Sequence, residues 1–180
     1  MSDRVIGPLR EARTPLTNGL RQLQLAASAT ASAETPVALA SLDNAVAYLR
    51  NIFLPVAEAE EFTLYIAVDG VLGAVGATDV MKAQHASIAV MTEDLGKVVS
   101  AAREDDDVPA YAQYLLPLLH GLYALVRAHL ESEDDVYLPL LDDHLSESQV
   151  GMLVDNIGRI SAARREDALA GRPAADHTSL

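Results

Sequence analysis

Four long stretches of the chain repeat their apolar residues at steps of three and four, which is the spacing of one face of an α-helix. They cover residues 3–28, 35–67, 78–103 and 110–142, and short polar or glycine-rich segments separate them. This periodicity excludes most architectures, because long amphipathic helices must bury their apolar faces against one another. The only run with strand character, VLGAV at residues 71–75, is too brief to support a sheet.

A fifth, shorter helix follows the four long ones. Ser146 can cap its first turn while Gln149 reaches back to the backbone of Ser146, which is the pattern of a capping box. We therefore predict an all-α fold, an up-down-up-down four-helix bundle with an additional C-terminal helix packed on its outside or end. The bundle domain covers residues 1–166, a flexible tail covers residues 167–180, and Pro55 is expected to bend the second long helix.

The charge balance limits the partners of the chain. Its 26 acidic residues against 13 Lys and Arg give a formal net charge of −13, which repels nucleic acid and anionic membrane surfaces. No apolar stretch of about 18 residues lacks a charge or a helix breaker, and the N-terminal segment has no secretion signal, so we expect a cytoplasmic protein. Because the sequence contains no cysteine, histidine and carboxylate are the only strong metal-ligand types.

Ionisable residues fall on the predicted inward faces of the helices. They are Arg13, Glu60, His85, His129 and Glu133. His129 and Glu133 stand four residues apart, which places their side chains one above the other on the same helix face. The pair alone is weak evidence, but its convergence with Glu60 and His85 from two other helices predicts one interior site. Two imidazoles and two carboxylates suit iron, manganese or zinc, and the oxygen ligands favour iron.

A more specific signal lies in four segments, LREARTPL, FLPVAEAEEFTLY, MKAQHASI and LYALVRAHLESEDDVYLPLLD. They resemble the hemerythrin-like proteins, also called the HHE cation-binding domain family, and the resemblance extends over residues 8–142. It implies a four-helix bundle with two non-haem irons that binds or senses dioxygen, or reacts with peroxide or nitric oxide. Carried over to this chain, the matching metal ligands are His85, His129, Glu133 and Glu60.

Three positions depart from the family pattern. Arg13 stands where the first helix of the family carries a histidine, and Ile52 and Val56 stand where the second helix carries histidines. The resemblance assigns these lost ligand positions to one iron, so it implies a degenerate site with one half emptied. A guanidinium cannot ligate a metal and adds positive charge. The favourable role for Arg13 is therefore to pair with Glu60 or Glu133.

Two interpretations of the interior follow. In the first, the two histidines and two carboxylates hold a single metal ion. This is at most the remaining half of a two-iron site, with open positions for dioxygen or a similar small molecule. In the second, the bundle binds no metal, Arg13 completes a hydrogen-bonded network, and the protein is a sensory bundle or binds a small ligand or a protein partner. The lost ligands and an inward Arg13 favour the second. The sequence names no substrate, so enzyme activity and oligomeric state stay open.

The other polar residues receive simpler interpretations. A Tyr65 that supplies an oxygen to the cavity is one alternative, but we expect Tyr65 at the rim of the site or in packing. We expect His120 on the side of its helix that faces away from the site. Ile52, Phe53 and Val56 are expected in an ordinary packed core. The acidic residues expected on a solvated face are Glu58, Glu61, Glu131, Asp134 and Asp135.

Overall fold

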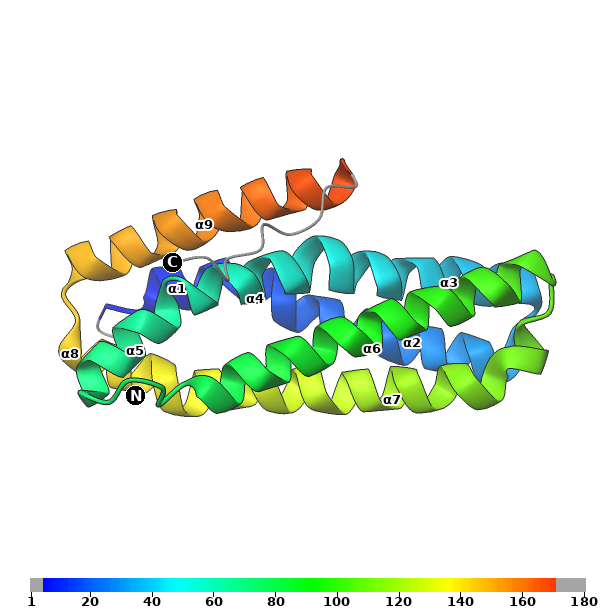
Figure 1. Ribbon diagram of the computed structural model, residues 1–180, viewed down its shortest axis with the longest axis horizontal. Coiled ribbons are helices and arrows are strands. Elements are labelled where there is room, and N and C mark those ends of the chain that lie inside the picture. The colour runs from blue at the N-terminus through cyan, green and yellow to red at the C-terminus, as the bar shows by residue number, and fades with distance from the viewer. Residues whose placement is uncertain (1–4, 171–180) are drawn as a thin grey trace.

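Four of the helices form an antiparallel bundle. The computed structural model describes residues 5–170, and these contain no β-strand. The bundle helices are α2 (Thr14–Ser32), α3 (Thr35–Tyr48), α6 (Asp79–Glu104) and α7 (Val108–Ser132). They run alternately in opposite directions along one long axis, and α7 packs back against α2 (Figure 1). The predicted up-down-up-down topology is confirmed.

The first predicted helix is broken at Arg13. Instead of one helix over residues 3–28, the chain forms α1 (Gly7–Ala12) and then α2. Arg13 adopts φ −88° and ψ −8°, and its amide donates to the carbonyl of Arg10 over 3.2 Å, a tight turn at a helix end. Pro15 favours the break, because it fits the first turn of a new helix but has no N–H to continue the ladder of the old one. The prediction of a continuous helix was wrong.

The second predicted helix, residues 35–67, consists of several pieces. After α3 come a π-helical turn, η1 (Leu49–Phe53), then α4 (Leu54–Glu61) and, beyond a short break, α5 (Leu64–Leu72). Pro55 lies just after the π-turn. Because proline cannot donate an N–H to the preceding turn, a wider turn there avoids a lost bond and a clash of the ring. The irregularity predicted at Pro55 takes the form of this π-turn.

The fourth predicted helix contains a second π-turn. Helix α6 matches the prediction for the third, whereas α7 is followed by η2 (Glu133–Tyr137) and α8 (Leu138–His144). A π-turn holds more residues than an α-turn, so the buried face advances along the sequence. The helical period that aligns His129 with Glu133 also predicts Val136 on the buried face, but Val136 is 58% exposed and Leu138 is fully buried in its place. Glu133, at the start of η2, keeps its place on the buried face.

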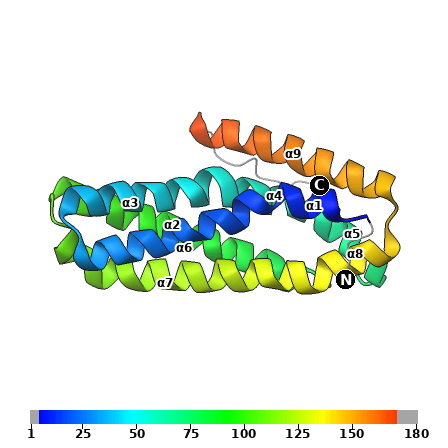
Figure 2. The same cartoon turned by 180° about the vertical axis from the view of Figure 1, so that it is seen from behind.

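The additional C-terminal helix, α9 (Glu147–Leu169), lies along the outside of the bundle over α4 and α1 (Figures 1 and 2). It begins with the predicted capping box, in which the amide of Gln149 donates to Ser146 Oγ over 3.4 Å and the amide of Ser146 donates to Gln149 Oε1 over 2.9 Å. Arg164 of α9 forms an ion pair of 2.7 Å with Glu58 of α4. The helix continues past residue 166, and residues 171–180 of the predicted tail lie outside the described residues.

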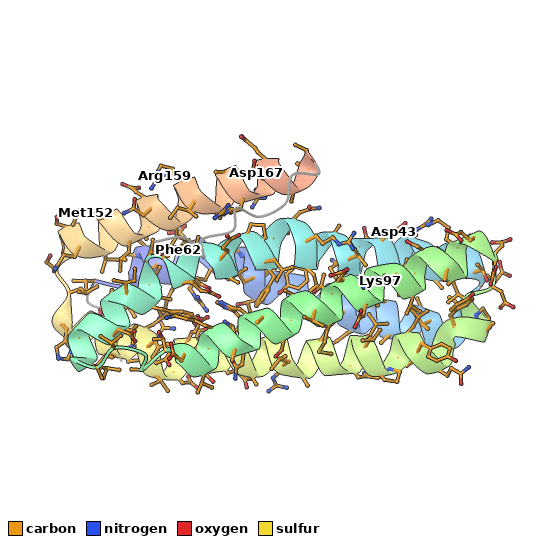
Figure 3. All side chains as sticks on the ribbon, viewed as in Figure 1. Asp43, Phe62, Lys97, Met152, Arg159 and Asp167 are labelled. Carbon is orange, nitrogen blue, oxygen red and sulfur yellow. The ribbon has the colours of Figure 1, made fainter. Side chains whose placement is uncertain are left out.

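Side chains fill the space between the helices (Figure 3). The buried apolar side chains form two clusters. The larger cluster joins α2, α3, α6 and α7, and the smaller one joins α1, α5, α8 and α9. Phe53 of the larger cluster and Tyr65 of the smaller one both contact His85, so the polar residues lie where the two clusters meet. Over the described residues, no helix is both long enough and apolar enough to cross a membrane.

Candidate metal centre

The predicted interior residues are all buried, and they meet at one level of the bundle. They come from different elements: Arg13 from the α1–α2 junction, Glu60 from α4, His85 from α6, His129 from α7 and Glu133 from η2. None is more than 5% exposed. Each lies on the buried face of its helix or turn, which is the consequence of the helical period seen in the sequence.

The two histidines face each other across the bundle. Their Nε2 atoms lie 2.9 Å apart. The opposite ring nitrogen of each is already engaged, because His85 Nδ1 lies 2.9 Å from Glu61 Oε1 and His129 Nδ1 lies 2.9 Å from Gln84 Oε1. Glu61 is a carboxylate and accepts, so Nδ1 of His85 donates to it and Nε2 of His85 carries a lone pair. Gln84 presents its Oε1 to His129, and in this orientation of the amide Nδ1 of His129 donates as well, so that both Nε2 lone pairs point into the same small space.

Glu61 and Gln84 were not predicted as parts of the site. Glu61 was expected on a solvated face, but its side chain is 31% exposed and holds His85. Acceptors of this kind orient metal-bound imidazoles and raise their basicity. Nothing in the spacing of the sequence pairs residues 61 and 84 with the histidines, since the contacts run between different helices.

Phe53 and Tyr65 fix the orientation of the imidazole rings. Phe53 lies edge-on to His85 and His129, with ring centres 6.2 Å and 5.8 Å away, and Tyr65 stacks on His85 at 5.4 Å. Phe53 is buried as predicted, whereas Ile52 and Val56 are only half-buried and pack against apolar residues. The rings thus have apolar walls on one side and polar partners on the other.

Tyr65 lies inside the site, where its ring packs in the core, so a place at the rim is wrong and the alternative of an oxygen in the cavity holds. Its hydroxyl donates to Glu133 Oε1 over 2.7 Å and lies 3.2 Å from His85 Nε2 and 3.4 Å from His129 Nε2. Burial, followed by the charge of Glu133, raises the pKa of Tyr65 far above its ordinary value. The break between α4 and α5 sets the direction of this side chain, and that break was not foreseen.

Arg13 points into the bundle and joins the two carboxylates. Its Nη1 donates to Glu60 Oε1, and its Nη2 donates to Glu133 Oε2 over 2.5 Å. Its Nε lies 3.6 Å from Asp134 Oδ1 but has no hydrogen-bond partner among the described residues. The predicted pairing of Arg13 with these carboxylates is confirmed.

Burial and charge move the two carboxyl groups in opposite directions. Burial and the neighbouring Glu133 carboxylate raise the pKa of Glu60 to about 8, against the lowering effect of Arg13. Burial also acts to raise the pKa of Glu133, but the charge of Arg13, the neighbouring His129 and the hydrogen bond from the Tyr65 hydroxyl outweigh it and lower the pKa to about 2. Burial lowers the pKa of His85, which favours a neutral imidazole. Two carboxyl groups thus share one guanidinium, and a proton on Glu60 balances the remaining charge.

The donors present fit around one metal ion. One ligand atom from each of Glu60, His85, His129 and Glu133 lies within 4.8 Å of all the others. Donors on opposite sides of one ion are at most about 4.4 Å apart when each lies about 2.2 Å from the metal, so a small shift brings all four into one coordination shell. The remaining histidines of the described chain, His120 and His144, are exposed and take no part, and His177 lies outside the described residues.

A four-helix bundle with a buried set of two histidines and two carboxylates defines the class of helical bundles whose interior side chains can hold a metal ion. Within this class, the model of one family matches residues 9–141, that of the hemerythrin HHE cation binding domain. The match covers more than half of the chain, so the protein belongs to this family. Searches of curated proteins and of solved structures found no match.

Proposed function

We propose that the protein holds a single transition-metal ion between His85 and His129, with Glu133 as a third ligand, and that Arg13 stands in place of the second ion of a hemerythrin-like centre. The main support for this proposal is the pair of imidazoles of His85 and His129. In the orientation that the Gln84 amide takes here, both Nε2 atoms present lone pairs to each other over 2.9 Å, an arrangement that a cation or a proton between them stabilises.

The spacing of the two nitrogens supports an ion. Neighbouring ligands in an octahedral shell with bonds of about 2.1 Å are about 3.0 Å apart. The observed 2.9 Å matches that separation. The acceptors on the two Nδ1 atoms, Glu61 and Gln84, supply the outer hydrogen bonds that metal-bound histidines make.

The charge of the interior also supports an ion. Glu60 and Glu133 together can carry two negative charges, and Arg13 compensates one of them. A divalent cation would stabilise the ionised form of Glu60 and displace its proton, because burying an uncompensated carboxylate is costly. The two imidazoles with carboxylate oxygen form a donor set of iron, manganese and zinc sites.

Arg13 makes a second ion unfavourable. Two-metal centres place their ions about 3.5 to 4 Å apart, and the second ion would need donors beyond Glu60. There the guanidinium of Arg13 binds both carboxylates, while Val56 and Ile52 offer no lone pair. A single ion held by three or four protein ligands keeps open positions, so the small-molecule ligand we propose is dioxygen, peroxide or nitric oxide, as the family resemblance implies.

A second candidate is a metal-free bundle, and one observation favours it. Arg13 already binds an oxygen of each carboxylate, so the Arg13–Glu60–Glu133 network is satisfied without an ion when Glu60 carries a proton. In that case the protein is a scaffold or sensory bundle whose interior charge is held by side chains alone.

Metal uptake separates the two candidates. Metal-free protein is incubated with ferrous ion without oxygen, passed over a desalting column and assayed for bound iron. We expect about one ion per chain, and loss of that ion in His85→Ala but not in His120→Ala, the exposed control. A wild-type protein that retains no more iron than His85→Ala, and whose melting temperature does not respond to ferrous, manganous or zinc ion, supports the metal-free bundle instead.

A double substitution tests the role of Arg13. Arg13→His together with Val56→His places imidazoles at two of the lost ligand positions. The variant is expected to retain about two ions per chain where the wild type retains one. An unchanged ratio in a folded double variant would mean that Arg13 does not occupy the place of a second ion.

A further inference from the structure

We propose that Tyr65 is a ligand of the metal ion, so that the site offers a phenolate oxygen beside its two imidazoles and Glu133. This inference rests on the proposed one-ion site and adds to it a donor that the family pattern of histidines and carboxylates does not contain. It also determines which metal and which oxidation state the site prefers.

The geometry around the hydroxyl carries the inference. Tyr65 Oη, His85 Nε2 and His129 Nε2 form a triangle with sides of 2.9, 3.2 and 3.4 Å. Neighbouring donors around one ion with bonds of about 2.1 Å are about 3.0 Å apart in an octahedral shell and about 3.4 Å apart in a tetrahedral shell. The three atoms therefore have the spacing of one face of a coordination shell.

Hydrogen bonding alone does not account for these contacts. The phenol has one hydrogen, and its short contact of 2.7 Å to Glu133 Oε1 takes it. Nε2 of His85 has no hydrogen, because its Nδ1 donates to Glu61, and a neutral His129 has one hydrogen in all, which its Nδ1 donates to Gln84 Oε1 in this structure. The three atoms that surround one point thus have at most one hydrogen between them, too few for their three contacts. A cation at that point removes the repulsion between the remaining lone pairs.

The phenol is also held in place. Tyr65 is fully buried, and its ring stacks on His85 with an interplanar angle of 19°. Its ring centre also lies 6.2 Å from the ring centre of Tyr137. A side chain packed in this way cannot turn its hydroxyl elsewhere without opening the core. The phenol oxygen is therefore already positioned for coordination in the metal-free protein.

Coordination changes the chemistry of the site in a defined way. The O–H bond of Tyr65 breaks, an oxygen–metal bond forms, and the proton leaves to solvent, so metal uptake releases one more proton than it would with phenylalanine at this position. No electron is transferred in this step. A phenolate is an anionic oxygen donor, so it stabilises a trivalent ion more than a divalent one, and the site should prefer ferric iron over zinc.

The test compares ferric-loaded wild type with Tyr65→Phe and with Tyr48→Phe. Tyr48 is the matched control, since it is equally buried and its hydroxyl donates to a backbone carbonyl, that of Leu16, over 2.8 Å. We expect a visible charge-transfer band from phenolate to iron in the wild type and in Tyr48→Phe, and its loss in Tyr65→Phe. Affinity for ferric ion should fall at least tenfold in Tyr65→Phe, by analogy with the loss of groups that support metal ligands.

Each outcome bears on one proposal. If the wild type binds iron but has no such band, or if Tyr65→Phe keeps the band, Tyr65 is not a ligand, while the one-ion site stands. If the wild type retains no iron, the one-ion site itself fails and Tyr65 falls with it. Should Tyr65→Phe not fold, resonance Raman spectra of the ferric wild type decide, because excitation in the band enhances tyrosine ring vibrations only if a tyrosinate is bound.

Discussion

Removing the charge of Arg13 should destabilise the protein strongly, with or without metal. Arg13→Met keeps the length and packing of the side chain but leaves Glu60 and Glu133 facing each other inside the bundle. These carboxyl groups are 2% and 0% exposed, so water cannot replace the guanidinium. Taking one partner from a buried ion pair costs about 3 to 5 kcal/mol, because the charge left behind is uncompensated.

The size of the effect on the melting temperature follows from the length of the chain. Unfolding entropy is about 2.1 cal/mol/K per residue, which gives about 0.4 kcal/mol/K for 180 residues. A loss of 3 to 5 kcal/mol therefore lowers the melting temperature by about 8 to 13 °C. Adding Glu60→Gln removes the cost of keeping Glu60 protonated in the folded state at neutral pH. The double variant should recover part of the loss, a coupling of about 1 to 3 kcal/mol.

Thermal unfolding followed by circular dichroism in a chelating buffer measures these differences. Arg127→Met is the control, since Arg127 pairs with Glu131 at 2.7 Å on the exposed surface of α7, where solvent screens the pair and it contributes little to stability. The control should melt within about 2 °C of the wild type. The argument is refuted if Arg13→Met melts as the control does, or if Glu60→Gln adds to the loss instead of offsetting it.

Two further predictions concern stability. In chelating buffer, the free energy of unfolding should rise between about pH 2 and 4.5, because the lowered pKa of Glu133 favours its ionised form in the folded state. It should then fall between pH 4.5 and about 8, because the raised pKa of Glu60 favours its protonated form in the folded state. Urea unfolding at a series of pH values checks this, and a fall that persists unchanged in Glu60→Gln contradicts it. Gly19→Ala should destabilise by about 1 to 3 kcal/mol despite a better helix propensity, because a Cβ there overlaps the ring of Tyr48. Gly158→Ala on α9, where a Cβ meets nothing, should instead stabilise by up to about 1 kcal/mol, and equal melting shifts for the two would disprove the packing argument.

The bundle and the buried positions of its polar residues could be predicted because both depend on one local quantity, the helical period. His129 and Glu133 share a face whatever the neighbouring helices do. The direction of the Arg13 side chain was harder to predict, since a modest rotation of its helix would turn Ala12 inward in its place. The structure settles its direction through the break at Arg13, which lets α1 and α2 take separate orientations.

The features that could not be predicted depend on contacts between helices or on changes in the helical period. Val136 was placed inward on a constant period, and the π-turn before α8 moved Leu138 into that position. Tyr65 follows Glu60 by five residues, so a continuous helix would turn it to another face, and only the break before α5 returns it to the site. In the sequence, nothing distinguishes Glu61 from the neighbouring acidic residues on the solvated face. Its role depends on a contact with His85, which lies on another helix.

The two unusual residues of the site should act on a bound iron in opposite directions. Arg13 is permanently charged, and it forms an ion pair with Glu133, the carboxylate proposed to bind the ion. A fixed positive charge beside the ion favours its lower oxidation state, whereas a phenolate from Tyr65 favours the higher one. In a redox titration, Arg13→Met should therefore lower the reduction potential and Tyr65→Phe should raise it. Shifts of the same sign in both variants would show that general loosening of the core, and not these charges, controls the ion. Opposite shifts would mean that an arginine at one side of the centre and a tyrosine at the other together set the potential of the site.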